Sequence, residues 1–433
     1  MVLLDLPEEL LDLVCEAIHD DDDEIEARMV KNRSPNLLNF ALTSRFIYKI
    51  ASTWLQREVR IHHPSPRADA LLQRLRETPS EGNRIRSLFI WNKEDAYTGD
   101  SSELDFLLKA AVNLHELYVP FFPSRALSSS LLDEKLECAK TLELICLDGN
   151  HSYGIADLFR MLSFPRLQSF QIFRFNDTEC CADLPCQLPL LPLTCLRLTS
   201  CQIGMPMFDA IISSCSKLQQ LEFLLPFPEQ VHEVPDSWNI TWASARVFIP
   251  LTLSMLPIAV RLNRFKDTLT ELHILTNRQF WQDHDGTKLD LSDFKSLKFL
   301  WASSNCFFHC SSEESARQGF YRLLPSSLCY LDMVWGQDSG IFFPNPGVPL
   351  PLIRIWYQRE FEGDNDHTWI LELARQKKTH LPRLREVEFH EDMMQPLGEG
   401  VHEMSDWKPS TVMNEFASAG ITLTVMYRVM QYH

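Results

Sequence analysis

The sequence has few glycines and lacks the motifs that cradle phosphate or present a catalytic serine. Only 14 of its 433 residues are glycine, and neither a Gly-x-x-x-x-Gly-Lys loop nor a Gly-x-Ser-x-Gly turn occurs. Basic residues number 41 against 58 acidic ones, which gives a formal net charge of −17. Nucleic-acid binding needs clustered lysine and arginine to neutralise phosphates. The missing motifs argue against an enzyme that binds phosphate in a glycine-rich loop and against a serine hydrolase. The shortage of basic residues argues against nucleic acid as a partner.

Long apolar runs and a regular cysteine framework are missing as well. The longest apolar stretch, residues 248–260, is interrupted by prolines and hydroxyl residues and is too short to cross a bilayer. The first residues lack the cationic region of a signal peptide. The 12 cysteines are mostly single, which favours reduced thiols over a secreted disulfide scaffold. We therefore expect a cytoplasmic and/or nuclear protein with no membrane partner.

Two amphipathic helical patterns open the chain. In the first, Leu6, Leu10 and Val14 recur every four residues, as apolar side chains do on one face of a helix. A second pattern with the same spacing covers about residues 36–55, and the acidic run at residues 19–24 between them predicts a solvated loop. A small helical unit cannot bury all of these apolar positions internally.

The residues of these two patterns resemble an F-box, in LPEELLDLV at positions 6–14 and LLNFALTSRF at positions 37–46. In that family the motif is a three-helix unit that docks on the Skp-type adaptor of an SCF ubiquitin ligase. The long acidic insertion between about residues 19 and 35 departs from the family, and a plain helical cap for the following domain is the alternative. For a helical domain at residues 1–61, the resemblance implies adaptor contacts by Leu6, Pro7, Leu10, Val14, Leu42, Ser44, Arg45 and Phe46.

An apolar-x-x-apolar-x-apolar pattern fills most of the remaining sequence. It occurs eleven times, at intervals of mostly about 25 to 30 residues. The last two apolar positions of each copy predict a strand with one buried face, and the segments between copies have helical spacing. The copies begin at positions 85, 114, 142, 167, 193, 218, 269, 297, 328, 350 and 384.

Repeated strand–helix units bury their apolar faces by stacking, so the pattern predicts a leucine-rich-repeat solenoid with a parallel concave sheet. The expected fold is thus α/β, with this domain at residues 68–433. The consensus Asn or Cys follows four copies, at Asn150, Cys201, Asn277 and Asn305. The alternating stretch that begins at Ile421 is a candidate last strand. Residues 225–268 are one repeat too long, which predicts an irregular excursion before a helix near residues 256–265.

The residues interleaved with the strand leucines are the candidate partner-binding positions. Period-two alternation puts them on the face opposite the leucines, where exposed aromatic side chains can anchor a partner. The neighbouring carboxylates favour a basic segment with a bulky apolar residue; the alternative is that loops cover the rings as peripheral core. The candidates are Phe299, Trp301, Tyr330, Asp332, Arg354, Trp356, Glu386 and Glu388, with Phe89, Trp91, Glu116 and Tyr118 toward the amino-terminal end.

Catalytic and metal-binding patterns are weak. Cys306, His309 and Cys310 lack the second pair of ligands that a closed zinc site needs, and so do Cys180, Cys181 and Cys186. We expect no catalytic residue, metal or cofactor. The resemblance implies a substrate receptor that binds a Skp-type adaptor, and through it a cullin–RING ligase, together with an unknown target protein. A repeat-based binding scaffold that acts outside any ligase is the alternative.

Overall fold

A computed structural model describes most of the repeat region and part of the amino-terminal segment. The described positions are 7, 10, 11, 13–15, 18, 39–63, 65–92, 101–119, 140–148, 155–175, 189–226, 251–276, 281–308, 314–335, 341, 368–394 and 410–430.

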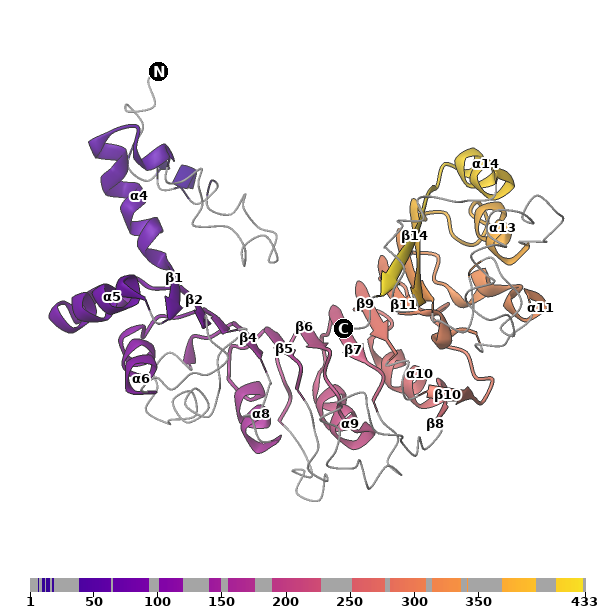
Figure 1. Ribbon diagram of the computed structural model, residues 1–433, viewed down its shortest axis with the longest axis horizontal. Coiled ribbons are helices and arrows are strands. Elements are labelled where there is room, and N and C mark those ends of the chain that lie inside the picture. Colours follow the sequence, from indigo (N-terminus) through magenta and orange to yellow (C-terminus); the bar gives the residue numbers. More distant parts are fainter. Residues whose placement is uncertain are drawn as a thin grey trace. The chain divides into compact units, whose positions relative to one another are not determined.

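The fold is α/β, built on an open parallel sheet of twelve strands, as the repeat pattern predicts (Figure 1). The strand order is β1-β2-β3-β4-β5-β6-β7-β9-β11-β12-β13-β14, and β8 and β10 form a separate parallel pair. The strands are β1 (Glu58–His63), β2 (Ser87–Asn92), β3 (Glu116–Val119), β4 (Leu144–Asp148), β5 (Ser169–Phe173), β6 (Cys195–Thr199), β7 (Gln220–Leu224), β8 (Leu251–Leu253), β9 (Glu271–Leu275), β10 (Trp281–His284), β11 (Phe299–Ser303), β12 (Tyr330–Trp335), β13 (Glu386–Met394) and β14 (Thr422–Met430).

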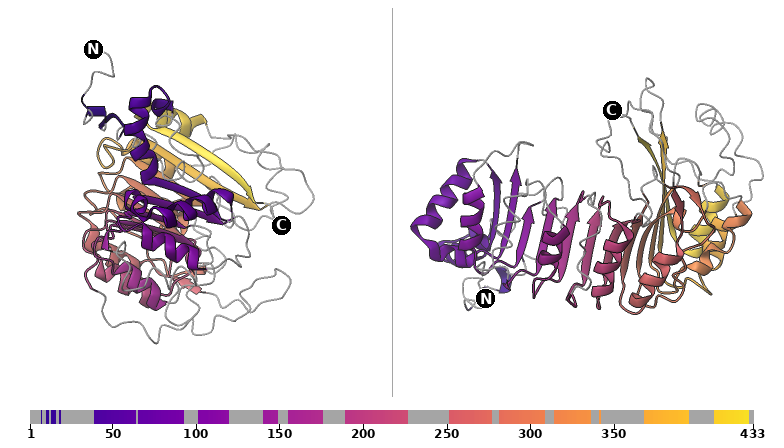
Figure 2. Two further views of the ribbon diagram at one scale, coloured as in Figure 1. Left: turned by 90° about the vertical axis from the view of Figure 1, so that its left-hand side faces the viewer. Right: turned by 90° about the horizontal axis from the view of Figure 1, so that it is seen from below.

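Helices connect many of these strands and lie along one side of them (Figures 1 and 2). None of the helices within the described ranges is long and apolar enough to span a membrane. The α-helices are α4 (Arg45–Arg57), α5 (Pro66–Glu77), α6 (Ser101–Ala110), α8 (Ile155–Leu162), α9 (Met205–Ser214), α10 (Leu256–Leu262), α11 (Glu314–Arg317), α13 (Thr368–Arg375) and α14 (Ser410–Ala419). Short 3-10 helices are η2 (Pro79–Arg84), η6 (Asn263–Phe265), η7 (Ser304–Cys306) and η8 (Phe320–Leu323).

The chain divides into two compact units, which we treat separately. Unit 1 comprises residues 1–193 and 198–203, and unit 2 comprises residues 194–197 and 204–433. Strands β1 to β5 therefore belong to unit 1, and strands β7 to β14 to unit 2. The division that the sequence predicts, at residues 61–68, stays a prediction; β1 ends at His63 and pairs with β2.

The predicted repeat copies coincide well with the strands. Ten of the eleven copies lie on sheet strands, and the alternating stretch after Ile421 forms the last strand, β14, as expected. The copy at residues 350–355 lies outside the described residues. Strand β12 pairs directly with β13. Strand β1 was not predicted, because residues 58–63 lack the full leucine pattern.

The leucine positions pack inward because alternate strand residues point to opposite faces. In β7 and β9 every second residue is buried, and the first apolar position of each copy within the described residues is buried just before the strand. A polar contact that the sequence analysis missed joins successive repeats: a hydroxyl before the first leucine donates to the carbonyl of the preceding repeat's first leucine. The pairs are Thr141 to Leu114 (2.7 Å), Thr268 to Leu218 (2.8 Å) and Ser327 to Leu297 (2.7 Å).

The consensus position after the strand plays a similar role at Cys201. Its buried thiol lies 3.2 Å from the carbonyl oxygen of Ile172 in the preceding repeat. Asn150 and Asn277 lie outside the described residues, and Asn305 lies in η7. Each hydroxyl hydrogen bond of this kind contributes about 1 kcal/mol and the thiol contact less, so together they help to fix the stacking of the repeats.

The predicted excursion is partly described. Residues 227–250 lie outside the described ranges, after which β8 pairs with β10 apart from the main sheet. The predicted helix near residues 256–265 is present, as α10 followed by the 3-10 turn η6. This segment is therefore an inserted element between β7 and β9, which pair with each other in the sheet.

Candidate partner-binding surfaces

The amino-terminal helical residues enclose a small apolar core. Ser44 caps α4, because its hydroxyl accepts a hydrogen bond of 3.1 Å from the backbone N–H of Ile47. The side chains of this core form one cluster, and its buried members are nearly inaccessible to solvent. The buried residues are Leu11, Cys15, Ala41, Ile50, Ala51 and Trp54, with Ile18 and Phe40 packed against them.

The same segments also carry large apolar side chains that are exposed to solvent. Leu42 is 70% exposed, and Leu10 and Phe46 are each 45% exposed. Leu13 and Tyr48 are exposed as well. We call these five residues the outer apolar surface. Single exposed leucines are ordinary, whereas a group on a small helical segment marks a candidate interaction surface.

The predicted adaptor-contacting residues fall largely on this outer side. Val14 and Ser44 are half-buried, and Leu6 lies outside the described residues. Sequence reasoning missed Leu13 and Tyr48, although both are large residues in the two amphipathic patterns. The predicted residues that are exposed are Pro7, Leu10, Leu42, Arg45 and Phe46.

A row of polar side chains crosses six strands of unit 2 at one register position. Each of these residues stands between the last two apolar positions of its repeat. The row is Glu222, His273, Trp301, Asp332, Glu388 and Thr424, on β7, β9, β11, β12, β13 and β14. We call it the unit 2 row. Sequence alternation predicted that these residues share a face; their side-by-side register comes from the strand pairing.

His273 lies between two carboxylates of this face. Its Nε2 is 3.0 Å from an oxygen of Glu271, and its Nδ1 is 3.7 Å from an oxygen of Glu222. Arg197 also approaches Glu271, at 3.4 Å. The hydrogen bond from His273, and the charges of His273 and Arg197, hold the pKa of the Glu271 carboxyl below its ordinary value. The His273 ring meets Trp301 edge-on, with centroids 5.2 Å apart.

A second histidine, His390, has a different arrangement three strands away, on β13. Its Nε2 is 3.1 Å from Oδ2 of Asp332 and 3.5 Å from Oε2 of Glu388. His390 and Asp332 are buried, so Asp332 is not the exposed residue that we predicted. Burial, the charge of Asp332 and a hydrogen bond to Glu388 raise the pKa of the Tyr330 phenol far above its ordinary value.

A second set of residues on this face begins the same strands; of these, Phe299 is exposed, and Tyr330 and Glu386 are half-buried. Phe299, Tyr330 and Glu386 are in register on β11, β12 and β13. Phe299 is 47% exposed, and its ring lies 6.3 Å from that of Tyr330. Of the other predicted partner-binding residues, Trp301 and Glu388 are half-buried. Arg354 and Trp356 lie outside the described residues.

The equivalent row of unit 1 is closed. Phe89 and Tyr118 stack face to face, with ring centroids 4.2 Å apart, and both are fully buried together with Cys146. The prediction that Phe89 and Tyr118 are exposed is therefore wrong, and the alternative of peripheral core applies to them. Glu116 is half-buried and accepts a hydrogen bond of 2.7 Å from the Ser87 hydroxyl, while the side chain of Trp91 is outside the described set.

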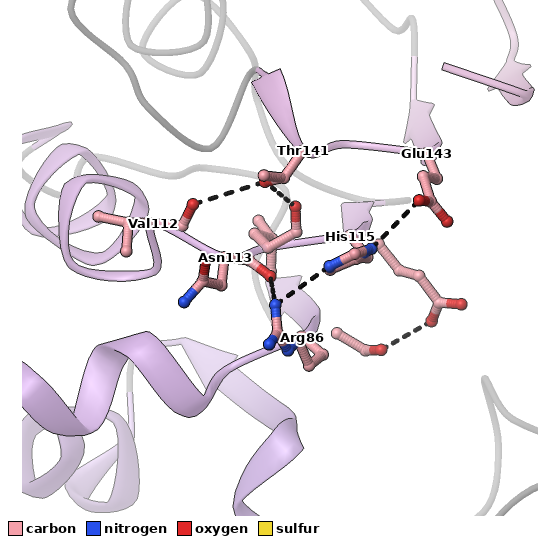
Figure 3. A network of polar contacts seen from close by, with 9 residues as sticks. Arg86, Val112, Asn113, His115, Thr141 and Glu143 are labelled. Atoms are coloured by element: carbon pink, nitrogen blue, oxygen red, sulfur yellow. Dashed lines mark hydrogen bonds and ion pairs between the residues drawn. The ribbon is translucent and has the colours of Figure 1, made fainter. Parts of the chain in front are cut away.

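A polar network joins the residues just before three strands of unit 1 (Figure 3). Arg86 donates to the carbonyl oxygen of Asn113 at 3.1 Å and lies 3.1 Å from Nε2 of His115, whose Nδ1 is 3.4 Å from Glu143. The backbone N–H of Glu143 also donates to the carbonyl of His115. These contacts link repeats along the sheet, a structural role that accounts for all three side chains.

No protein-family model and no curated protein matches this chain.

Proposed function

We propose that this chain is the substrate receptor of an SCF-type ubiquitin ligase. The amino-terminal helices dock on a Skp-type adaptor, and the strand face of unit 2 binds the target protein. The chain itself performs no chemistry: it raises the effective concentration of the target beside a conjugating enzyme that a cullin–RING assembly carries. Such a receptor works in the cytoplasm and/or nucleus.

The observation that carries the adaptor role is the contrast between the two sides of the amino-terminal segments. Their inner side already has a closed core around Ala51, whereas Leu10, Leu42 and Phe46 remain in solvent. A segment that served only as a cap would have no need of this second apolar side. Burial of such side chains against a partner is worth about 1.5–3 kcal/mol each.

The chemistry of the unit 2 face indicates the kind of target. Phe299 offers an exposed ring, and Glu271 is in register with it on the neighbouring strand β9. The carboxylates of Glu222, Glu386 and Glu388 lie on the same face, two strands from Phe299 on β7 and β13. Aromatic anchors dominate interface energies, and charge complementarity steers association. The face is suited to a basic segment with one bulky apolar residue.

Adaptor binding is tested by co-purifying the full chain with a Skp-type adaptor. We expect Leu10→Asp and Phe46→Asp each to weaken the complex at least tenfold, because a charge would be buried at the interface. Both side chains are exposed in the free chain, so its thermal stability should change little.

The matched control is Leu190→Asp, since Leu190 is 79% exposed but lies outside the outer apolar surface. This variant should bind the adaptor normally. If the unsubstituted chain does not bind the adaptor, or if all three variants bind it equally, the receptor role fails and the independent scaffold remains.

A further inference from the structure

A buried cluster on the unit 2 face has the composition of a cation site. Asp332, Glu388 and His390 each offer one ligand atom, and these atoms lie within 4.8 Å of one another. Strand pairing makes the cluster: Asp332 is in register with Glu388, and His390 follows two residues later on the same face of β13. Asp332 and His390 are 58 positions apart in the sequence, so no short sequence motif predicts that they meet.

The distances suit a single ion better than a peptide cation. Two ligands at about 2.1 Å from one metal are separated by about 3.0 Å in octahedral and about 3.4 Å in tetrahedral geometry. The Nε2–oxygen separations are 3.1 and 3.5 Å. The side chains of His390 and Asp332 are 3% and 10% exposed, which leaves little room for a lysine or arginine head group.

An unsatisfied carboxylate oxygen points to a missing ligand. Oδ1 of Asp332 is buried and has no hydrogen-bond partner among the described residues. A buried acceptor without a partner costs about 1–3 kcal/mol, more when it is charged. A bound cation would satisfy this oxygen, and it would also lie between Nε2 of His390 and the two carboxylates.

We propose that Asp332, Glu388 and His390 bind a divalent transition-metal ion, with Zn²⁺ as the first choice. One imidazole and two carboxylates suit borderline ions, and three protein ligands leave a coordination position open. The Tyr330 hydroxyl donates to Glu388 and would orient that ligand from outside the coordination shell. The site does not depend on the proposed ligase role.

The neighbouring histidine provides a matched comparison. His273 also has two carboxylates, but they approach opposite ring nitrogens, so Glu271 and Glu222 do not converge on one point. Glu222 and Glu388 stand in the same row, each beside a histidine. Substitution at the His273 cluster should therefore leave metal binding unchanged.

The site is tested by titrating zinc chloride into the full, metal-free chain. Calorimetry measures the binding, and the thermal melting temperature measures the stabilisation. Glu388→Gln is the main variant, because the change is isosteric and Glu388 is the most exposed of the three ligands. We expect this variant to lose one equivalent of bound Zn²⁺, or to bind it at least tenfold more weakly, and to lose most of the zinc-induced rise in melting temperature. His390→Gln should do the same if it folds.

The controls are Glu222→Gln and His273→Gln, which should retain the full zinc stoichiometry and the rise in melting temperature. Cysteines elsewhere in the chain can bind Zn²⁺, so only the difference between variants counts. Equal stoichiometry and affinity in Glu388→Gln and Glu222→Gln would overturn the site, and so would an equal loss in both.

Discussion

The two units use one strand pattern to build two different surfaces. In unit 1, the position between the last two apolar residues holds Phe89, Tyr118 and Cys146, which are fully buried. In unit 2, the same position holds charged or polar residues such as Glu222 and His273, which keep contact with solvent. The leucines on the other face are buried in both units. The buried leucines thus determine the fold, and the interleaved positions determine whether a face is closed or available.

The difference is one of chemistry as well as exposure. Phe89 and Tyr118 stack on each other, and the guanidinium of Arg60 lies 4.9 Å from the Phe89 ring centroid. Their contacts are therefore internal. In unit 2, by contrast, the carboxylates exceed the cations that face them, so this surface needs either a cation or a basic partner to balance its charge.

Truncation of a ring in each unit should separate the surfaces most clearly. Phe89→Ala removes a fully buried, stacked ring and should lower the free energy of unfolding by about 3–5 kcal/mol. Phe299→Ala removes an exposed ring and should cost less than about 1 kcal/mol. Denaturant unfolding, with hydrogen exchange of β2 and β3 to locate the effect, measures both. Equal losses would mean that the two faces do not differ.

The leucine pattern is the part of the fold that sequence predicts well. It places ten strands and the last strand β14, because a half-buried strand leaves a period-two signature that no covering loop can alter. Strand β1 was not predicted, because only Val59 and Ile61 have that period-two spacing. The copy at residues 350–355 has the pattern, yet β12 pairs directly with β13.

The candidate sites are less predictable, for a physical reason. Alternation shows that Phe89 and Trp301 occupy equivalent positions, but whether such a ring is covered depends on contacts from distant segments. For the same reason, the sequence alone predicted that Asp332 is exposed. Its partner His390 belongs to the next strand of the sheet, and only the register of β12 with β13 brings them together.

Thiol reactivity should report the same contrast. Cys146 is buried in the closed row of unit 1, whereas Cys329, just before β12, is half-buried. We expect iodoacetamide to alkylate Cys329 about a hundredfold faster than Cys146, because a buried thiol reacts only when the structure opens. Peptide mass spectrometry over a time course gives both rates.

Cys215 and Cys306 are the internal controls for that experiment. Burial raises the pKa of both thiols to about 12, so at pH 8 they stay protonated and should resist alkylation as Cys146 does. Alkylation of Cys146 at the rate of Cys329 would show that the unit 1 row opens readily, which would weaken the contrast between the units.

Binding of a basic peptide should distinguish the faces more modestly. A synthetic lysine-rich peptide with one tryptophan serves as the probe, with its affinity measured by fluorescence anisotropy at low salt. Glu386→Lys should weaken binding about tenfold, because it reverses a charge beside Tyr330, whose ring lies next to that of Phe299. Glu77→Lys, on the exposed surface of α5 in unit 1, should have little effect. Equal affinity for both variants would remove the proposed target chemistry.

The smallest expected effect is an acid-dependent loss of stability in unit 2. The depressed pKa of Glu271 means that its ionised form is stabilised by folding, through His273 and Arg197. This contribution is complete above the ordinary pKa of 4.5 and is lost as the pH falls through the lower, folded value. Because the pair is partly exposed, the contribution should be below about 1 kcal/mol.

Glu271→Gln removes that contribution and provides the measurement. In denaturant unfolding at each pH, the unsubstituted chain should be more stable than Glu271→Gln at pH 6, and the two should converge as the pH falls below 4.5. High salt should reduce the difference at pH 6, because Glu271 is partly exposed and its attraction to Arg197 is screened. A stability difference that grows as the pH falls would contradict the assignment of His273 and Arg197 as the partners of ionised Glu271. The charged face of unit 2 would then not be stabilised by these contacts.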